Sequence, residues 1–316
     1  MQLFRLRRAL AGLLALTLLS PFAPVGAQDD VAARIGTDQD VLRRPDEEVA
    51  GRQIPFRITD PELGEIDLVS RAPRPKTFTF STDQNLLYTT NAFLAPDPER
   101  DTFFWNGRLA GSYVPYSTVN FTPRINFEQN FFRYDEFGVL DFDSQSLQFD
   151  MKYDFRRDDS WYANLSYTGA RLYSPDDNVG EFYRYGLLAA SVTNVRQLGG
   201  MPLYLSSSLG SNWRHGDPSD FDRATVYLNF ILLYKPMETL QFAAFARPEM
   251  QFYLRDPNDD SRRDFNFNAG IGATWTPIEY FSMGVAGSFT GNASSAARQD
   301  YKVFLPGVVA SGHVSF

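Results

Sequence analysis

The feature that most constrains this chain is a strict alternation of apolar and polar side chains, sustained over segments of ten residues or more. The segment 146–155 shows it clearly: its odd positions are Leu, Phe, Met, Tyr and Phe, and its even positions are Ser, Gln, Asp, Lys and Asp. Successive side chains of an extended strand point to opposite faces. This two-residue period therefore predicts a strand with one apolar face and one polar face.

Twelve such segments follow one another from residue 76 onward. Dividing residues 76–316 among them leaves about 20 residues for each strand and its connection. Soluble β-sandwiches carry a turn signal roughly every 8–12 residues, so these strands are too long for that architecture. The segments lie near residues 76–92, 102–115, 118–134, 141–155, 160–173, 181–197, 202–215, 223–235, 239–254, 264–276, 279–290 and 301–316.

The connections between these segments are of two alternating kinds. Five are short, such as "PYS" and "PIE", and six are longer and mostly acidic, such as "APDPERD" and "DPNDDSRRD". Short periplasmic turns and longer outside loops are typical of transmembrane barrels. Five turns and six loops fit twelve antiparallel strands whose two ends emerge on the short-turn side, so both termini are predicted to be periplasmic.

Aromatic residues gather at the ends of the predicted strands. The chain has 28 Phe, 16 Tyr and 4 Trp, and clusters at 103–105, 131–134 and 182–185 flank strand middles rich in Ala, Leu, Val and Gly. Two aromatic girdles around an aliphatic band are what a bilayer requires. Backbone groups cannot stay unpaired in lipid, so a membrane sheet must close on itself. We predict an all-β, closed, antiparallel up-and-down transmembrane β-barrel of about 12 strands, with a soluble β-sandwich as the alternative architecture.

The first 75 residues differ from the barrel segment. A basic start, an apolar stretch over 9–22 and small residues before Gln28 predict a signal peptide at 1–27. Residues 28–75 are rich in Pro and charge without a period, which predicts an extended, weakly ordered periplasmic segment. A solvated linker is the favoured interpretation, and docking on the barrel mouth or on a periplasmic partner is the alternative. The barrel then occupies 76–316. Because the chain has no cysteine, thiol catalysis and cysteine metal sites are excluded.

The last residues carry a further signal. Val314 and Phe316 lie two residues apart on the apolar side of the final segment. Together with the signal peptide and about 240 residues of alternation, this ending resembles the bacterial outer-membrane β-barrel proteins, whose C-terminal signal is recognised by the barrel-assembly machinery. Ser311 stands where that family often has Gly, and Gly312 is one place off. The resemblance implies an outer-membrane location among lipid and lipopolysaccharide, and it assigns Val314 and Phe316 to the assembly signal.

The polar face of each strand is expected to line the barrel lumen. We predict a mixed, mildly basic interior with seven cations and five carboxylates. The segment 181–197 follows the two-residue period least, because both of its faces are partly apolar. The predicted lumen-lining residues are Asp83, Arg108, Arg124, Glu128, Asp150, Lys152, Asp154, Arg184, Arg196, Arg214, Arg247 and Glu249.

Two functions compete for such a lumen. The leading one is a narrow passive channel for small polar or anionic solutes, or an envelope component of a larger export or surface-polymer system. In the alternative, the charges pair into a network that plugs the barrel, which is then structural, or adhesive through its acidic extracellular loops. Barrels of roughly 8 strands are filled by side chains and those of roughly 16–18 strands hold open channels, so twelve strands leave both functions open.

A barrel hydrolase is the third and least supported function. The chain has two histidines, His215 and His313, and His215 lies near Asp217, Ser219 and Asp220. Sequence neighbours in one loop rarely assemble a catalytic triad, so no catalytic residue is assigned, and His313 is expected to be structural. The acidic loops consist of ordinary turn residues and lack the spacing of a calcium loop. No metal site, cofactor or nucleic-acid partner is predicted.

Overall fold

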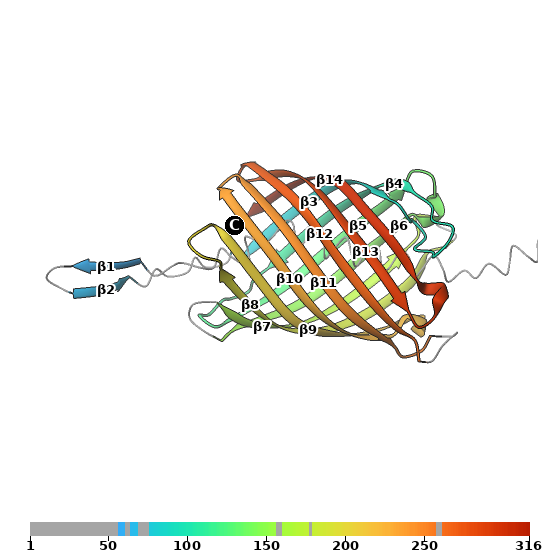
Figure 1. The fold of residues 1–316 in the computed structure, drawn as a ribbon, viewed down its shortest axis with the longest axis horizontal. Coiled ribbons are helices and arrows are strands. Elements are labelled where there is room, and N and C mark those ends of the chain that lie inside the picture. The colour runs from blue at the N-terminus through green and yellow to red at the C-terminus, as the bar shows by residue number, and fades with distance from the viewer. Residues whose placement is uncertain (1–55, 61–63, 69–75, 156–159, 177–178, 257–260) are drawn as a thin grey trace, which may run out of the picture.

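The computed structural model describes residues 56–60, 64–68, 76–155, 160–176, 179–256 and 261–316. The predicted signal peptide 1–27 and most of the predicted periplasmic segment 28–75 lie outside the described residues. Within that segment, β1 (Phe56–Asp60) and β2 (Gly64–Leu68) pair with each other as an antiparallel two-stranded sheet, separate from the main sheet (Figure 1).

Twelve strands form one closed antiparallel barrel in which strands consecutive in sequence are neighbours (Figure 1). The pairing of β14 with β3, from Gly307↔Leu87 to Ser315↔Thr79, closes the sheet. The predicted up-and-down barrel is therefore confirmed, and the alternative sandwich is wrong. The strands are β3 (Phe78–Thr89), β4 (Thr102–Tyr113), β5 (Phe121–Tyr134), β6 (Phe142–Asp154), β7 (Trp161–Tyr173), β8 (Glu181–Gln197), β9 (Leu203–Asp217), β10 (Arg223–Met237), β11 (Leu240–Tyr253), β12 (Arg263–Ile278), β13 (Phe281–Ser294) and β14 (Tyr301–Ser315).

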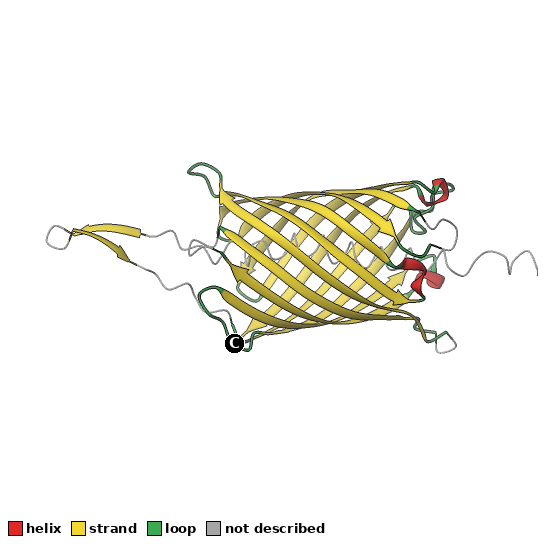
Figure 2. Ribbon diagram, turned by 90° about the horizontal axis from the view of Figure 1, so that it is seen from below, coloured by secondary structure: helices red, strands yellow, loops and turns green. Residues whose placement is uncertain are grey.

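The two ends of the barrel differ in their connections (Figure 2). At the turn end, short connections join β4 to β5, β6 to β7, β8 to β9, β10 to β11 and β12 to β13. At the loop end, the other connections include three short 3-10 helices, η1 (Gly138–Leu140), η2 (Ser219–Phe221) and η3 (Ala297–Gln299). No helix in the described part of the chain has the length and apolar character needed to cross a membrane.

Most strands present an apolar outer face and a more polar inner face. On β3, the side chains of Phe80 and Leu86 are 54 % and 52 % exposed, whereas Asp83 and Asn85 are each 2 % exposed. Because neighbouring strands are in register, these faces continue around the barrel. Large apolar side chains therefore point away from the barrel axis, as a lipid-facing surface requires.

The aromatic clusters at the loop ends of the strands divide between the two faces. Phe103 and Trp105 are exposed on the outer face, but Phe104 between them is buried on the inner face. The register of β4 with β5 places Phe132 and Tyr134 on the inner face too. The interpretation of each whole cluster as girdle residues was therefore wrong for its inward members, because consecutive side chains of one strand cannot share a face.

Phe316 lies at the turn end of the closing strand pair. Its backbone N–H donates to the Phe78 carbonyl at 3.0 Å, and its carbonyl accepts from the Phe78 N–H at 2.9 Å. Its exposed ring lies 6.1 Å from the ring of Phe78 and 6.1 Å from that of Phe80. Val314 is exposed on the same outer face. Recognition of these two residues by the assembly machinery stays a prediction.

Candidate functional site

The inner face of the barrel is the candidate site, because most of the charged residues predicted to line the lumen lie there. Their register partners are inner-face residues as well, as in Asp83↔Arg108 and Arg124↔Asp150. A role for these residues in conduction stays a prediction. The predicted residues on the inner face are Asp83, Arg108, Arg124, Glu128, Asp150, Lys152, Asp154, Arg214, Arg247 and Glu249.

Arg184 and Arg196 lie on the outer face, which corrects their assignment to the lumen. Arg184 pairs in register with Arg171 of β7, and both side chains are exposed. Arg196 is exposed on the same side of β8. The inner face of this strand carries aromatic and aliphatic residues such as Tyr185 and Val195. With apolar residues on both faces, alternation alone could not identify which side of β8 faces the lumen.

A buried ion-pair cluster joins β3, β4 and β5 across the inner face. Arg108 donates to the Asp83 carboxylate at 3.2 Å and to the Glu128 carboxylate, and Asn130 donates to Glu128 at 2.7 Å. The side chains of Arg108 and Asp83 are only 7 % and 3 % exposed. Burial of a charge is costly unless the charge is paired and hydrogen-bonded, so each member of this cluster stabilises the others.

Arginine side chains stack on tyrosine rings along the opposite part of the inner face, from β8 to β12. The Arg214 guanidinium lies 4.4 Å from the Tyr185 ring centre, and Arg247 lies 4.1 Å from that of Tyr227. Such cation–π contacts hold a guanidinium in a fixed plane. We call this set the arginine–tyrosine wall, which consists of Tyr185, Arg214, Arg223, Tyr227, Arg247, Tyr253 and Arg262.

The loop-end part of this wall is a dense hydrogen-bonded network. Arg262 lies 3.9 Å from the ring centre of Tyr253 and bonds to Asp256 at 2.9 Å and to Asp264 at 3.0 Å. Asn292 also donates to Asp264, at 3.1 Å. Burial by itself lowers the pKa of Arg262, but the hydrogen bonds and charges of its carboxylate partners outweigh burial and raise it. The guanidinium therefore stays charged.

Sequence reasoning missed several members of this network. Arg223 and Asp264 are inner-face residues at the beginning of β10 and of β12. The two-residue period, extended outward from Tyr227 and Asn266 to the strand ends, would have found them. Arg262 and Asp256 lie in the β11–β12 connection, where no period applies, so no sequence signal identifies them as lumen residues.

An apolar cluster fills the inner face at the loop end of β4 to β8 and β14, and we call it the apolar cap. Its rings stack closely: Phe132 lies 4.2 Å from Phe142, and Phe104 lies 4.9 Å from Tyr134, between ring centres. Ala92 and Leu94 of the β3–β4 loop and Leu140 of η1 complete the cluster at the loop end. The buried members are Ala92, Leu94, Phe104, Phe132, Tyr134, Leu140, Phe142, Leu172, Tyr183, Tyr301, Val303 and Leu305.

Asn91 fastens the β3–β4 loop over this cap. The side chain is fully buried and donates to the carbonyls of Ala95 at 2.7 Å and Lys302 at 3.1 Å, while its amide oxygen accepts from the Ala95 N–H at 3.1 Å. Leu94, at the tip of this turn, has a positive φ of 49°. The loop is therefore folded inward and bonded both to itself and to β14.

The inner face at the turn end has small side chains on β12 to β14, β3 and β4. Along β4, the inner positions change from buried Phe104 and Arg108 to the partly exposed Ala110 and Ser112. Across the barrel, larger residues such as Tyr162 are buried on the inner face. We call the small-residue region the turn-end vestibule, lined by Thr79, Ser81, Ala110, Ser112, Gly272, Ser282, Ala286 and Ser311.

The two histidines lie on different strands, β9 and β14. His215 lies on the outer face of β9, with its ring centre 5.6 Å from that of Trp213. Asp217, the carboxylate nearest in sequence, is ion-paired with Arg184 at 2.7 Å. His313 lies on the inner face at the turn end, where its backbone N–H donates to the Tyr280 carbonyl at 3.0 Å. The two rings therefore lie on different faces of the barrel.

Among the residues that the structure describes, no three histidine or carboxylate side chains form a group that could hold a metal ion. Two of the acidic loops, 174–178 and 256–260, lie partly outside those residues.

Solved structures share this fold at low sequence identity. An outer-membrane channel from Pseudomonas putida F1 is 14 % identical, with a TM-score of 0.53 over 79 % of this chain and 100 % of the channel. The translocator domain of the autotransporter NalP from Neisseria meningitidis is 11 % identical, with a TM-score of 0.51 over 91 % of this chain and 96 % of that domain. The fold is that of the bacterial outer-membrane β-barrels. The predicted resemblance is thus confirmed at the level of fold.

No protein-family model matches the sequence, and no curated protein is significantly similar to it. Function therefore has to be argued from the inner face itself.

Proposed function

We propose that this barrel lies in the bacterial outer membrane with both termini periplasmic, and that small anionic solutes diffuse through it passively. The arginine–tyrosine wall carries the proposal. Four guanidinium groups lie over three tyrosine rings along the inner face. Guanidinium groups bind carboxylates and phosphates through paired N–H donors, so such a wall favours anions over cations.

Neighbouring carboxylates keep anion binding at the wall weak. Glu249 accepts from Arg247 at 3.1 Å and from Gln251 at 2.6 Å. A passing anion has to compete with Glu249 for the guanidinium. Conduction requires sites that are favourable enough to enter and weak enough to leave, so this competition suits passage better than storage.

The distribution of side-chain size suggests a route for the solute. A solute entering from the turn end meets the small side chains of the vestibule first. Farther in, the apolar cap occupies the side formed by β4 to β8 and β14. The polar residues Arg223, Asp264 and Asn292 continue to the loop end on the other side. The route therefore follows β9 to β13, past the arginine–tyrosine wall.

Planar bilayers test this function directly. The purified protein is expected to give small single-channel currents, with a reversal potential in a KCl gradient that shows preference for chloride. The double variant Arg214→Gln and Arg247→Gln should lose that preference while keeping its folded, heat-modifiable band. Arg196→Gln, which changes an arginine on the outer face of β8, serves as the matched control and should conduct like the parent. A cation preference in the parent would contradict the proposal.

A closed barrel is the second candidate, and the apolar cap is the observation that favours it. Its buried rings and the Asn91 loop fill one side of the loop end. In this case the barrel acts as a structural or adhesive element through its acidic loops. Silence of the parent protein in bilayers, combined with currents in a variant lacking the cap, would support the closed barrel over the channel.

The location and the partner contacts need separate tests. Membrane fractionation with heat-dependent gel migration should place the protein in the outer membrane, and a water-soluble product would contradict this. Removal of residues 28–75 behind an intact signal peptide is expected to leave the barrel folded. Loss of an associated protein in cross-linking of that variant would support a periplasmic partner or a larger export system, whereas an unchanged pattern would argue against both.

A further inference from the structure

A row of charged side chains crosses the outer face at the loop end of β5 to β9. These residues share their face with large exposed side chains such as Leu188 and Trp213. A lipid-facing surface gains nothing from charge unless a polar partner meets it. We call the row the outer polar belt, made of Arg133, Asp143, Arg171, Glu181, Arg184 and Asp217.

The belt is continuous across neighbouring strands. Arg133 of β5 pairs with Asp143 of β6 at 2.6 Å, and Arg184 of β8 pairs with Asp217 of β9 at 2.7 Å. Between these pairs, Arg171 of β7 stands directly opposite Arg184. Five strands at about 4.8 Å spacing give the belt a width of roughly 19 Å.

The two central arginines are the unusual feature. Like charges directly opposite on adjacent strands are destabilising unless an anion lies between them. Arg171 lies 3.9 Å from the Glu181 carboxylate, which is beyond hydrogen-bonding distance, and its side chain is 68 % exposed. The side chain of Arg184 is 60 % exposed. Two exposed guanidinium groups at directly paired positions have the N–H donors and the charge that bind a phosphate.

Polar groups lie directly beneath this arginine pair. Gly186 is the next outer-face residue on β8 after Arg184, and a Cβ there would lie 2.6 Å from the Tyr167 hydroxyl and 2.4 Å from the His215 ring. The missing side chain leaves room for that hydroxyl and imidazole over the strand. They add neutral donors and acceptors of the kind that bind sugar hydroxyls.

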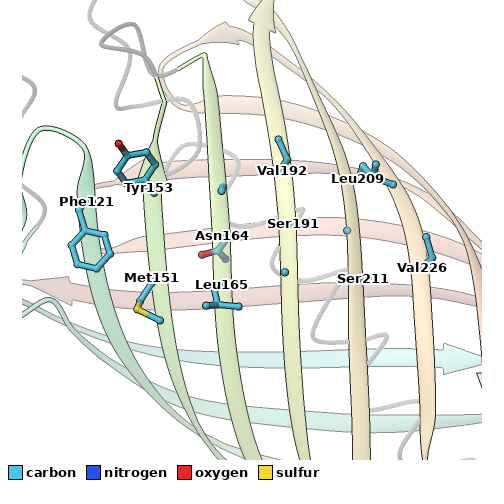
Figure 3. Close-up of a pocket in the computed structure, with 13 residues that line it drawn as sticks. Phe121, Met151, Tyr153, Asn164, Leu165, Ser191, Val192, Leu209, Ser211 and Val226 are labelled. Atoms are coloured by element: carbon cyan, nitrogen blue, oxygen red, sulfur yellow. The ribbon is translucent and has the colours of Figure 1, made fainter. Parts of the chain in front are cut away.

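Below the belt, the same strands form a shallow apolar groove of about 660 Å³ (Figure 3). Leu165, Val192 and Leu209 lie along it, with Met151 at one side and Val226 at the other. Six residues separate Arg184 from Ala190 in the groove, which corresponds to roughly 15 Å along the axis of a barrel with tilted strands. An acyl chain descending from the belt reaches this groove.

We propose that the outer polar belt binds the phosphorylated sugar headgroup of an outer-leaflet glycolipid, with an acyl chain of that lipid in the groove. Arginines alone would suit any anionic lipid. The carboxylates beside them, and the hydroxyl and imidazole below, can accept hydrogen bonds from sugar hydroxyls, which an ordinary glycerophospholipid largely lacks. The inference rests on the proposed membrane location and does not depend on conduction.

Native mass spectrometry of the refolded protein in detergent tests the site. The probes are diphosphorylated lipid A, its dephosphorylated form, phosphatidylglycerol and inorganic phosphate. We expect the parent to retain diphosphorylated lipid A, and the double variant Arg171→Gln and Arg184→Gln to bind it about 10-fold more weakly or less. Lys302→Gln, which changes an exposed cation at the loop end of β14, is the control and should bind like the parent.

Each other outcome overturns the proposal in a distinct way. Equal retention by the parent and the double variant would remove the belt as the site. Equal retention of phosphatidylglycerol would replace the glycolipid with a general anionic lipid. Displacement by millimolar inorganic phosphate would show a site for free phosphate. Conductance of the double variant should equal that of the parent, so a failed channel proposal and a failed lipid proposal give different results.

Discussion

Along β4, the inner face of the barrel differs sharply between the loop end and the turn end. At the loop end of β4, Phe104 and Asn106 are 2 % and 0 % exposed, and the first packs in the apolar cap. At the turn end of the same strand, Ala110 and Ser112 are small and partly exposed. One strand thus contributes to a packed interior and to an open vestibule within a dozen residues.

The two ends of the inner face should therefore contribute to different properties, the loop end to the stability of the barrel and the turn end to the passage of solutes. Packed rings and paired charges at the loop end resemble the core of a soluble protein, so substitutions there should change the free energy of unfolding. The vestibule side chains have few packing partners to lose, so substitutions there should change what passes through the lumen. Variants at the two ends should therefore differ in which of these two quantities they change.

Arg108→Met should be the most destabilising change. It leaves the carboxylates of Asp83 and Glu128 on the inner face without their cation, and removal of one member of a buried ion pair costs about 3–5 kcal/mol. Urea unfolding in vesicles, followed by tryptophan fluorescence, measures it. Ser112→Ala is the turn-end control and should change the unfolding free energy by less than ~0.5 kcal/mol. Similar changes in the unfolding free energy of the two variants would contradict the claim that stability depends mainly on the loop end.

Phe142→Ala should lower the free energy of unfolding by about 3 kcal/mol, because Phe142 is fully buried and stacks on Phe132. If the apolar cap also narrows the lumen, the same variant should conduct more than the parent. Phe149→Ala changes an exposed ring on the outer face of the same strand and serves as control. Lower stability without any change in conductance would assign the cap to stability alone.

Asn91→Ala should cost about 1–2 kcal/mol, because it removes the bonds that hold the β3–β4 loop to itself and to β14. Hydrogen exchange of the Ala95 amide should become faster. Exchange of the strand amides on either side of Thr102 should stay as in the parent. Unchanged exchange at Ala95 would show that other contacts fix the loop.

Ser112→Phe should have little effect on stability, because the side chain enters the vestibule where neighbours are small. Single-channel conductance should fall, since the ring occupies space along the proposed route. Tyr113→Phe alters the outer face at the next residue and should conduct like the parent. A Ser112→Phe protein with parental conductance would place the route elsewhere.

Tyr88→Phe should have the smallest effect, and the effect should depend on pH. The Tyr88 hydroxyl donates to Asp101 at 2.6 Å, and this bond lowers the pKa of the Asp101 carboxyl. A carboxyl with a lowered pKa in the folded state stabilises the fold above its unfolded pKa, and loses this contribution as the pH falls through the lowered value. The two proteins should therefore differ slightly at neutral pH and converge in acid. Urea unfolding of both proteins at neutral pH and at acid pH measures this difference in the free energy of unfolding.

How far the sequence predicted this structure depended on how different the two faces of each strand are. On β6, every outer position from Leu147 to Tyr153 is apolar and every inner position is polar. The alternation therefore identifies which side of this strand faces the lumen. On β8, apolar residues occupy both faces, and Arg184 and Arg196 were placed on the wrong one. Alternation reports the difference between faces, and it carries no information where they are alike.

The candidate site was predictable only where it lies on strands. The alternation of apolar and polar residues predicts that Arg214 and Arg247 face the lumen. It does not predict their tyrosine partners, because contacts across neighbouring strands depend on register. The aromatic clustering predicts Tyr185 as a girdle residue, but its ring faces inward and packs against the Arg214 guanidinium. Asn91 and Arg262 lie in connections, and their inward placement arises from tertiary packing that no local pattern records.

The seam between β14 and β3 has a consequence for how the protein is made. Thr79 and Ser315 share a hydrogen bond of 3.0 Å although 236 positions separate them along the chain. Every other neighbouring pair in the cylinder is consecutive, so hairpins can assemble in the order of synthesis. The cylinder can be completed only after β14 has been delivered, and until then β3 keeps an unpaired edge that invites aggregation.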